Sequence, residues 1–454
     1  MKTKQNLIQL GLLGAVLLSA LTSEAQPVIK IAGGGNHSLF LKSDGSLWAM
    51  GLDNYGQLGD GTNNTTYPYI WFNFPKQILT SNVTALAAGF EHSLFLKNDG
   101  SLWGMGRNLD GQLGIGSYLY CTNRPAQIVS SNVTTIAAGW DHSLFLKIDG
   151  SLWVMGNNSY GQLGDGTDYN SRNIPEQIEG SNVTAIAAGE SHSLFLMNDG
   201  SLWGMGYDRF GQLGNGAYTY AVIQPQQIVA SNVTAIAAGR NHSLFLKSDG
   251  SLWAMGTNYY GQLGDGTFNM TNRPEQIMAA NVTAIAAGQD YSLFLKSDGS
   301  LWGMGDNTYG QLGGGAQNST NRPKLIVSGG VTTISAGGGH CLFITNNGSL
   351  WVTGLNNNGQ LGDGTSNFST NHPELIVSNT NFNNIFVRLL NSGDLSLSLF
   401  GFAGTNYALD RSFSLSPPAW IPQATNPANS FGALIFTNTP NPAMNNFWRI
   451  RSVP

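Results

Sequence analysis

One segment of about 50 residues occurs seven times in this chain, and this repetition limits the fold more than any other feature. Aligned on the pattern "GxxHSLFL", the copies centre on His37, His92, His142, His192, His242, Tyr291 and His340. The spacings between them are 55, 50, 50, 50, 49 and 49 residues. A period of this length is typical of propellers and solenoids, in which one supersecondary unit packs against its own copies.

Each copy has the pattern of four short strands. In the sequence these are "VTAIAAG", "HSLFL", "SLWGMG" and, after a glycine-rich loop, "RPEQI". The second and third are joined by Asp-Gly in six copies, such as Asp149-Gly150, and by Asn347-Gly348 in the seventh. Such pairs tolerate the positive φ of a tight hairpin turn. Because four strands cannot bury both faces alone, we predict an all-β, seven-bladed β-propeller. Whether the first strand, "VIKIAGG", pairs within its own unit or with the last blade stays open.

The two ends of the chain differ from the repeats. Residues 1–25 have a basic start, an apolar run from Leu7 to Leu21 and small residues at Ser23 and Ala25, which is typical of a cleaved signal peptide. That run is shorter than the roughly 20 residues that span a bilayer. We therefore expect export, to the medium, the periplasm or the cell surface, with no transmembrane segment after cleavage. Residues 26–378 form the predicted propeller, and residues 379–454 are predicted to form a small C-terminal β-sandwich of five short strands.

Composition excludes several classes of function. Formal net charge is −5, and no cluster of lysine or arginine is present, so a nucleic-acid partner is disfavoured. Cys121 and Cys341 occupy non-equivalent positions of distant repeats and are predicted to be free thiols. The loop "GQLGDGT" lacks the GK[ST] ending of a phosphate-binding loop. No nucleophile set or carboxylate pair stands out from the repeats, so we expect neither an enzyme nor a cofactor.

The residues that recur in every copy are interpreted as structural. One tryptophan per copy lies on an apolar strand and is predicted to pack between blades: Trp48, Trp103, Trp153, Trp203, Trp253, Trp302 and Trp351. Equivalent histidines lie a blade apart, too far for one metal ion, and each is expected to bond a neighbouring backbone group. Five "NVT" tripeptides precede strands and are interpreted as bends without glycosylation: Asn82, Asn132, Asn182, Asn232 and Asn281.

These motifs together carry a resemblance. The pattern "AGxxHSLFLKxDGSLWxMGxNxxGQLGDGT" resembles the repeat of the regulator of chromosome condensation family over about residues 28–378. The resemblance implies a seven-bladed β-propeller. Nuclear members of the family are nucleotide exchange factors and bind chromatin. Secreted bacterial members, among them a propeller-type β-lactamase inhibitory protein, are more similar to this chain because of its leader and its acidic balance.

Positions that differ between copies indicate where a partner binds. They are the two residues of "GxxH" and the first and third residues after "MG". In an antiparallel blade both loops lie at one end, and the Asp-Gly turns lie at the other. Aromatic, arginine and acidic residues there are typical of protein interfaces. The candidate protein-binding residues are Phe90, Glu91, Arg107, Trp140, Asp141, Glu190, Tyr207, Arg209, Arg240, Tyr259 and Asp290.

We therefore predict a secreted, monomeric, non-catalytic scaffold that binds another protein through this end. Two alternatives are binding of carbohydrate or cell wall and, less favoured, an exchange-factor activity. The first copy also has an unusually aromatic loop, which contains Tyr67, Tyr69, Trp71, Phe72 and Phe74. These side chains either pack on the adjacent blade or form an exposed lip for a protein or polysaccharide.

Overall fold

The computed structural model describes residues 26–62, 71–315 and 317–378, together with six strands beyond residue 378. The predicted signal peptide and the side chains of Tyr67 and Tyr69 lie outside the described residues. The chain divides into two compact units, Gln26–Val377 and a second that includes Ser378–Pro454. No helix among the described residues is long and apolar enough to cross a membrane.

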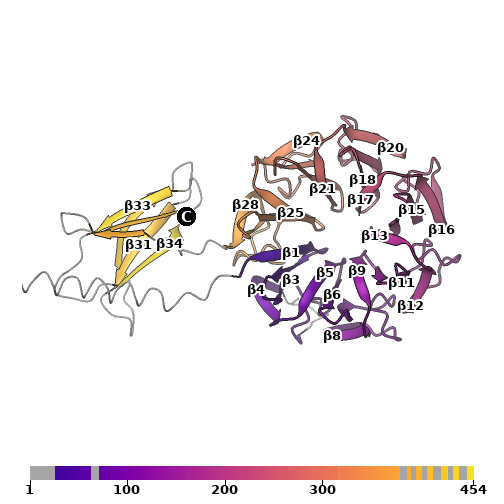
Figure 1. Ribbon diagram of the computed structural model, residues 1–454, viewed down its shortest axis with the longest axis horizontal. Coiled ribbons are helices and arrows are strands. Elements are labelled where there is room, and N and C mark those ends of the chain that lie inside the picture. The colour runs from indigo at the N-terminus through magenta and orange to yellow at the C-terminus, as the bar shows by residue number, and fades with distance from the viewer. Residues whose placement is uncertain are drawn as a thin grey trace, which may run out of the picture. The chain divides into compact units, whose positions relative to one another are not determined.

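The first unit is a propeller of seven four-stranded antiparallel sheets, each built from consecutive strands (Figure 1). The innermost strands are β1 (Val28–Gly33), β5 (Val83–Ala88), β9 (Val133–Ala138), β13 (Val183–Ala188), β17 (Val233–Ala238), β21 (Val282–Ala287) and β25 (Val331–Ala336). The second strands are β2 (His37–Lys42), β6 (His92–Lys97), β10 (His142–Lys147), β14 (His192–Met197), β18 (His242–Lys247), β22 (Tyr291–Lys296) and β26 (His340–Thr345).

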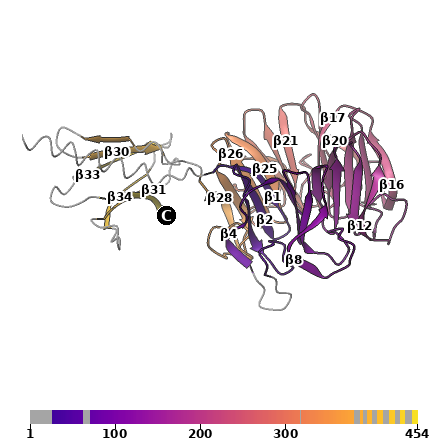
Figure 2. The ribbon, with the colours of Figure 1, turned by 60° about the horizontal axis from the view of Figure 1, so that its bottom comes forward.

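The outer half of each blade follows the same order. The third strands are β3 (Leu47–Leu52), β7 (Leu102–Arg107), β11 (Leu152–Gly156), β15 (Leu202–Asp208), β19 (Leu252–Gly256), β23 (Leu301–Gly305) and β27 (Leu350–Leu355). The outermost are β4 (Trp71–Leu79), β8 (Cys121–Val129), β12 (Arg172–Glu179), β16 (Thr219–Val229), β20 (Thr271–Met278), β24 (Thr320–Val327) and β28 (Ser369–Val377). Figure 2 shows these blades standing side by side around the ring. The predicted seven-bladed propeller is confirmed.

The ring closes without exchange of a strand, which answers the question that the sequence left open. β1 pairs with β2, and the first sheet has the order β1-β2-β3-β4. Blades one and seven meet through an apolar cluster that includes Val28, Phe40 and Leu342. One backbone hydrogen bond of 3.0 Å, from Val28 N to the Gly348 carbonyl, also crosses this contact. The closing contact therefore uses the same packing as the other blade contacts.

The repeated histidines join neighbouring blades. The ring Nε2 of His142 lies 3.0 Å from the Ser193 hydroxyl of the next blade, and that hydroxyl donates to the Gln162 carbonyl at 2.8 Å. Because the hydroxyl has one proton and donates it to the carbonyl, Nε2 must be the donor to the hydroxyl. Burial lowers the pKa of His142 to about 4, so the imidazole is neutral at pH 7. The same relay occurs from His37, His92, His192, His242 and His340. The expected backbone partner was wrong: the partner is a serine side chain across the blade contact.

The repeated tryptophans pack between blades, as predicted. Trp153 packs with Phe145 and Met155 against the apolar core of the preceding blade. Its ring stacks on Phe145 with centroids 6.0 Å apart, and its Nε1 donates to Ser151 at 2.9 Å. Lys147 Nζ lies 3.8 Å from the centre of the same ring. Each tryptophan is half-buried, so it closes the core rather than filling its centre.

Two smaller predictions have clear outcomes. Asn82, Asn132, Asn182, Asn232 and Asn281 have φ between 68° and 71°, and Gly330 takes the equivalent place with φ 78°. Asparagine tolerates this left-handed conformation, which explains the "NVT" tripeptides as bends. Cys121 and Cys341 form no disulfide, as predicted.

The second unit contains six described strands, one more than predicted. β29 (Phe386–Leu389), β30 (Leu395–Phe400) and β33 (Ala433–Asn438) form one antiparallel sheet. β31 (Asn406–Ser412), β32 (Ile421–Pro427) and β34 (Phe447–Val453) form another. Two three-stranded sheets agree with an all-β tail, and the sandwich arrangement stays a prediction.

Candidate functional site

The loops after the first and the third strand of every blade lie at one end of the ring, which we call the loop face. The turns between second and third strands lie at the other end, as the antiparallel order requires. Backbone bonds between blades fix the first loops: Phe90, Trp140 and Glu190 each donate their N–H to a glycine carbonyl of the next blade at 3.2–3.3 Å. Variable side chains of the loop face are therefore held on a fixed backbone.

At the centre of the loop face lies a small cavity, whose lining includes the variable residues Phe90, Trp140, Glu190, Arg240 and Gln289. The cavity has a volume of about 90 Å³ and is lined by the Ala-Gly ends of the innermost strands. Phe90 and Trp140 contact each other with ring centroids 4.4 Å apart. The Arg240 guanidinium lies 5.8 Å from the centre of the Trp140 ring, within the range of a cation–π interaction. We call these three residues the axial cluster.

Carboxylates lie around the axial cluster, and they outnumber the arginines with which they pair. Arg240 pairs with Glu190 at 2.9 Å and with Asp290 at 3.6 Å. On the other side, Arg107 pairs with Asp141, with Asp110 at 3.2 Å and with Glu91 at 3.7 Å. Five carboxylates thus share two guanidinium groups. We call Glu91, Asp110, Asp141, Glu190 and Asp290 the carboxylate ring.

Burial raises the pKa of four carboxyl groups of this ring. Burial raises the pKa of Glu91 to about 7, and the nearby Asp141 carboxylate adds to the effect against the opposing influence of Arg107. Burial is also the largest cause of the raised pKa of Asp141, Glu190 and Asp290. These carboxylates are therefore incompletely compensated by the arginines of the chain itself.

A connected group of aromatic side chains lies over blades three to five. The Tyr207 ring lies 4.7 Å from Tyr160 and 5.9 Å from both Phe210 and Tyr220. Phe210 in turn lies 6.4 Å from Tyr259 of the next blade. We call these five residues the tyrosine patch. The Tyr207 N–H donates to the Ser191 carbonyl at 2.8 Å, and Ser191 directly follows Glu190, so the patch lies next to the carboxylate ring.

Most of the residues predicted from the sequence come together on the loop face. Phe90, Trp140, Arg107, Arg240 and the four predicted acids form the centre, and Tyr207 and Tyr259 belong to the tyrosine patch. Arg209 is exposed, and no ion pair of it occurs among the described residues of the propeller. Whether these residues bind a protein stays a prediction.

Sequence reasoning missed an outer set of exposed aromatics. They follow the "GDGT" loops, just before or at the start of the outermost strands, and are Tyr118, Tyr120, Tyr169, Tyr218, Tyr220, Phe268 and Phe368. Their signal was present as "SYLY", "DYN", "AYTY", "TFNM" and "NFS" in an otherwise polar stretch. These loops do not adjoin the "GxxH" or "MG" motifs, so the comparison of motif-flanking positions does not include them.

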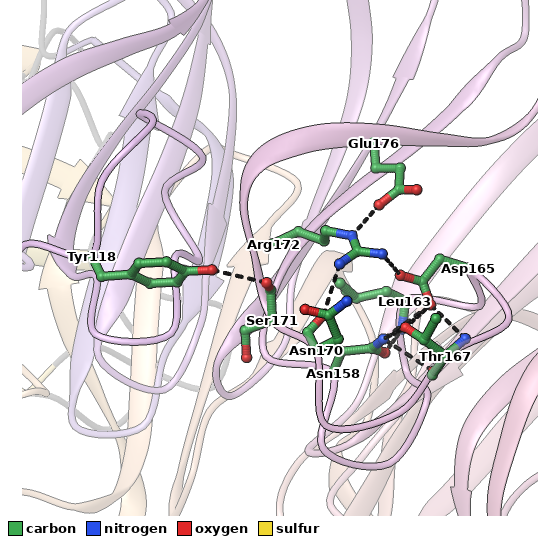
Figure 3. A network of polar contacts seen from close by, with 9 residues as sticks. All are labelled: Tyr118, Asn158, Leu163, Asp165, Thr167, Asn170, Ser171, Arg172 and Glu176. Atoms are coloured by element: carbon green, nitrogen blue, oxygen red, sulfur yellow. Dashed lines mark hydrogen bonds and ion pairs between the residues drawn. The ribbon is translucent and has the colours of Figure 1, made fainter.

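Polar contacts hold these outer loops in place, as blade three shows (Figure 3). Asn158 donates to Asp165 at 3.0 Å, and Asp165 accepts from both the N–H and the hydroxyl of Thr167. Arg172 then pairs with Asp165 at 2.5 Å and with Glu176. From the preceding blade, the Tyr118 hydroxyl donates to the Ser171 carbonyl at 2.9 Å.

The aromatic loop of the first blade contacts its neighbour where the structure describes it. Trp71 Nε1 donates to the Ser366 hydroxyl of blade seven at 3.2 Å. Phe74 lies against Gly364 of the same blade, where an added Cβ would come within 2.6 Å of the ring. Both side chains keep exposed surface, at 41% and 63%. The loop therefore packs on the adjacent blade and also remains accessible.

A closed ring of seven four-stranded sheets with variable loops at one end defines the class of seven-bladed β-propellers. Among the described residues, no group of three or more His, Cys, Asp or Glu could hold a metal ion. The family model described as the RCC1-like domain matches residues 121–393. Models of the regulator of chromosome condensation (RCC1) repeat match residues 28–57, 83–112 and 44–96. The chain belongs to the RCC1-like family, which confirms the predicted resemblance.

Among curated relatives, the ultraviolet-B receptor UVR8 of Arabidopsis thaliana is 33% identical over 89 residues, which is 20% of this chain and 20% of the receptor. The secretion-regulating guanine nucleotide exchange factor of Bos taurus is 35% identical over 86 residues, 19% of this chain and 18% of that protein. The aligned segments thus span about a fifth of the length of these relatives.

Two solved structures share the fold. Human WBSCR16 superposes with a TM-score of 0.65 and 24% identity, covering 73% of this chain and 95% of that one. Prp20p of Saccharomyces cerevisiae superposes with a TM-score of 0.64 and 22% identity, covering 80% and 88%. At this identity the two structures support the propeller fold alone.

Proposed function

We propose that this chain is an exported, non-catalytic scaffold whose loop face binds another protein. The observation that carries the proposal is the axial cluster. Phe90, Trp140 and Arg240 are the residue types that dominate binding energy in protein interfaces. They lie together at the centre of a face whose backbone is fixed by bonds between blades. A fixed backbone lowers the entropy lost on association.

The division between repeated and variable residues supports the same function. The repeated histidine, serine and tryptophan side chains and the backbone carbonyl of the repeated glutamine take part in contacts between blades, so their recurrence is explained by the ring itself. Among the described residues of the propeller, the loop face combines sequence variation with aromatic and charged side chains. Variable loops on a rigid scaffold are the arrangement that many binding proteins use.

Capture of partners by the immobilised protein tests the proposal. We expect the wild type to retain a protein from the secreted fraction of its native host, and Trp140→Ala to retain much less of it. Ile148→Ser is the matched control, because this side chain is 77% exposed in a turn at the opposite end. Equal capture by both variants would place the partner elsewhere.

A second measurement, of nucleotide release from small GTPases, tests the less favoured alternative of an exchange-factor activity. One relative is a guanine nucleotide exchange factor. Under our proposal, catalytic amounts of this chain do not accelerate nucleotide release from small GTPases. A clear acceleration would contradict the scaffold function.

A further inference from the structure

The tyrosine patch is the largest connected aromatic surface that the described loops present to solvent. Tyr220 is 51% exposed and Tyr259 is 59% exposed, although both contact other rings of the patch. Next to the patch, Tyr218 is 50% exposed and Tyr169 is 68% exposed. Such surfaces on soluble proteins mark sites of interaction. Tyrosine offers a large contact area and loses little conformational entropy on binding.

The charges beside the patch indicate what covers it. The carboxylate ring has five acids for two guanidinium groups, and its Glu190 directly precedes Ser191, whose carbonyl accepts the N–H of Tyr207 of the patch at 2.8 Å. Two exposed charged residues, Arg209 between Tyr207 and Phe210 and Asp168 before Tyr169, are close to the patch residues in sequence and have opposite charges. The excess negative charge therefore lies at the axial edge of the patch. A partner with positive charge at that edge would be complementary to it.

We propose that the loop face binds a basic segment of a protein partner, with lysine or arginine side chains against the carboxylate ring and apolar side chains on the tyrosine patch. This inference rests on the proposed function and specifies the chemistry of the partner. The chain itself shows that the site accepts a guanidinium. Arg240 lies over Trp140 and between Glu190 and Asp290. A cation from the partner would meet the same combination of an aromatic face and carboxylates.

The raised pKa of Glu91 in the carboxylate ring is a further reason to expect a positively charged partner. Glu91 has a pKa raised to about 7, with burial as the largest cause. A neighbouring cation would lower that pKa again, since it favours the ionised form. Binding of a basic partner would therefore relieve an unfavourable burial of charge that the free protein retains.

A pair of labelled peptides tests the proposal directly. The probes are a fluorescein-labelled dodecapeptide of alternating lysine and leucine and its counterpart with glutamate in place of lysine, measured by fluorescence anisotropy against the full chain. We expect the lysine probe to bind at least about tenfold more tightly than the glutamate probe. Tyr220→Ser with Tyr259→Ser should weaken the lysine probe about fivefold or more. Glu190→Gln should weaken it as well, and Ile148→Ser should not.

Three results would overturn the proposal. These are equal affinity for the two probes, lysine-probe binding that the tyrosine and Glu190 variants leave unchanged, and tyrosine-dependent binding of a neutral cell-wall oligosaccharide in place of either probe. If the basic probe fails but the protein captures an acidic partner through Trp140, this inference is wrong and the proposed function stands. If neither occurs, both are wrong.

Discussion

At the scale of single residues, one position shows how the ring tolerates exceptions. The second residue after each "MG" accepts the N–H of the leucine in "GQLG" in all seven blades. Five blades have asparagine there, and two have Asp53 and Asp208, both completely buried. The Asn158 amide also donates to Asp165, whereas Asp53 faces the Asp60 carboxylate. Burial, with that neighbour, raises the pKa of Asp53 to about 7.

We predict that Asp53→Asn stabilises the propeller at pH 8 by about 1–3 kcal/mol. The folded-state pKa of Asp53 lies above its unfolded value, so its contribution to stability falls as pH rises from about 4 to 7. The amide removes this loss and supplies the missing donor to Asp60. Urea unfolding of both proteins at pH 8 and pH 5 measures the difference, which should shrink at the lower pH.

The reverse change is the control. Asn158→Asp places a buried acid against Asp165 and should destabilise the protein at pH 8 by a similar amount. If Asp53→Asn and Asn158→Asp both lower stability at pH 8, the interpretation of Asp53 as a buried, unfavourable charge is wrong.

At the scale of elements, the contact between blades six and seven differs from the others in both of its partners. Tyr291 replaces the histidine, and Cys341 replaces the serine of the next blade. The Tyr291 hydroxyl donates to the His340 carbonyl at 2.5 Å, and both Tyr291 and Cys341 are completely buried in one cluster. Compared with the other blades, this contact has a larger ring on one strand and a side chain without a hydroxyl on the other. Together these two residues keep β22 packed against β26.

We predict that Tyr291→His and Cys341→Ser are coupled. Tyr291→His alone leaves a gap and an Nε2–H facing a thiol, which is a weak acceptor. Cys341→Ser alone buries a hydroxyl that can donate to a glutamine carbonyl, as in the other blades, but that accepts no bond from the Tyr291 ring. Each should cost about 2 kcal/mol, whereas the double variant restores the common pair and should cost less than the sum by about 1–2 kcal/mol. A double-mutant cycle of unfolding free energies measures this coupling, and strictly additive values would contradict it.

Sequence patterns predicted the elements well and their partners poorly. The 50-residue period, the alternation of strands and the Asp-Gly turns were sufficient for seven blades and for the end on which Phe90 and Trp140 lie. The partner of each histidine was not predictable in this way, because "HS" repeats in every copy and the bond joins a histidine to the serine about 50 residues later. Ring closure was open for the same reason, since all contacts between blades use the same residues. Of the tyrosine patch only Tyr207 and Tyr259 were predicted, because its rings come from loops of three blades and meet only in the fold.

At the scale of the whole molecule, six buried histidines make the stability of the propeller depend on pH. Burial lowers the pKa of His37, His92 and His192 to about 3 and that of His142, His242 and His340 to about 4. These values lie below the unfolded value of about 6.5, so stability is lost as pH falls through this window. Protonation would place a charge inside every relay at once.

We predict cooperative acid unfolding with a midpoint between about pH 4 and pH 5. At pH 5 each histidine costs about 2 kcal/mol, and the net stability of a protein is about 5–15 kcal/mol. Seven carboxyl groups with raised pKa values oppose the loss, among them Asp53, Asp208 and Glu91. Seven aspartates with lowered pKa values add to it, so the histidines decide the direction. Circular dichroism against pH measures the transition. A propeller that stays folded at pH 3.5 would refute the prediction.

The central claim is that repeated residues hold the ring together and variable residues bind, and two tryptophans test it in one experiment. Trp140→Ala and Trp153→Ala are compared by their affinity for the captured partner and by their unfolding free energy. We predict that Trp140→Ala costs about 2 kcal/mol or more of binding and at most about 1 kcal/mol of stability, because it is a half-buried loop residue. Trp153→Ala should cost about 3 kcal/mol of stability and bind as the wild type does. The claim would be contradicted if folded Trp153→Ala lost binding while Trp140→Ala kept it.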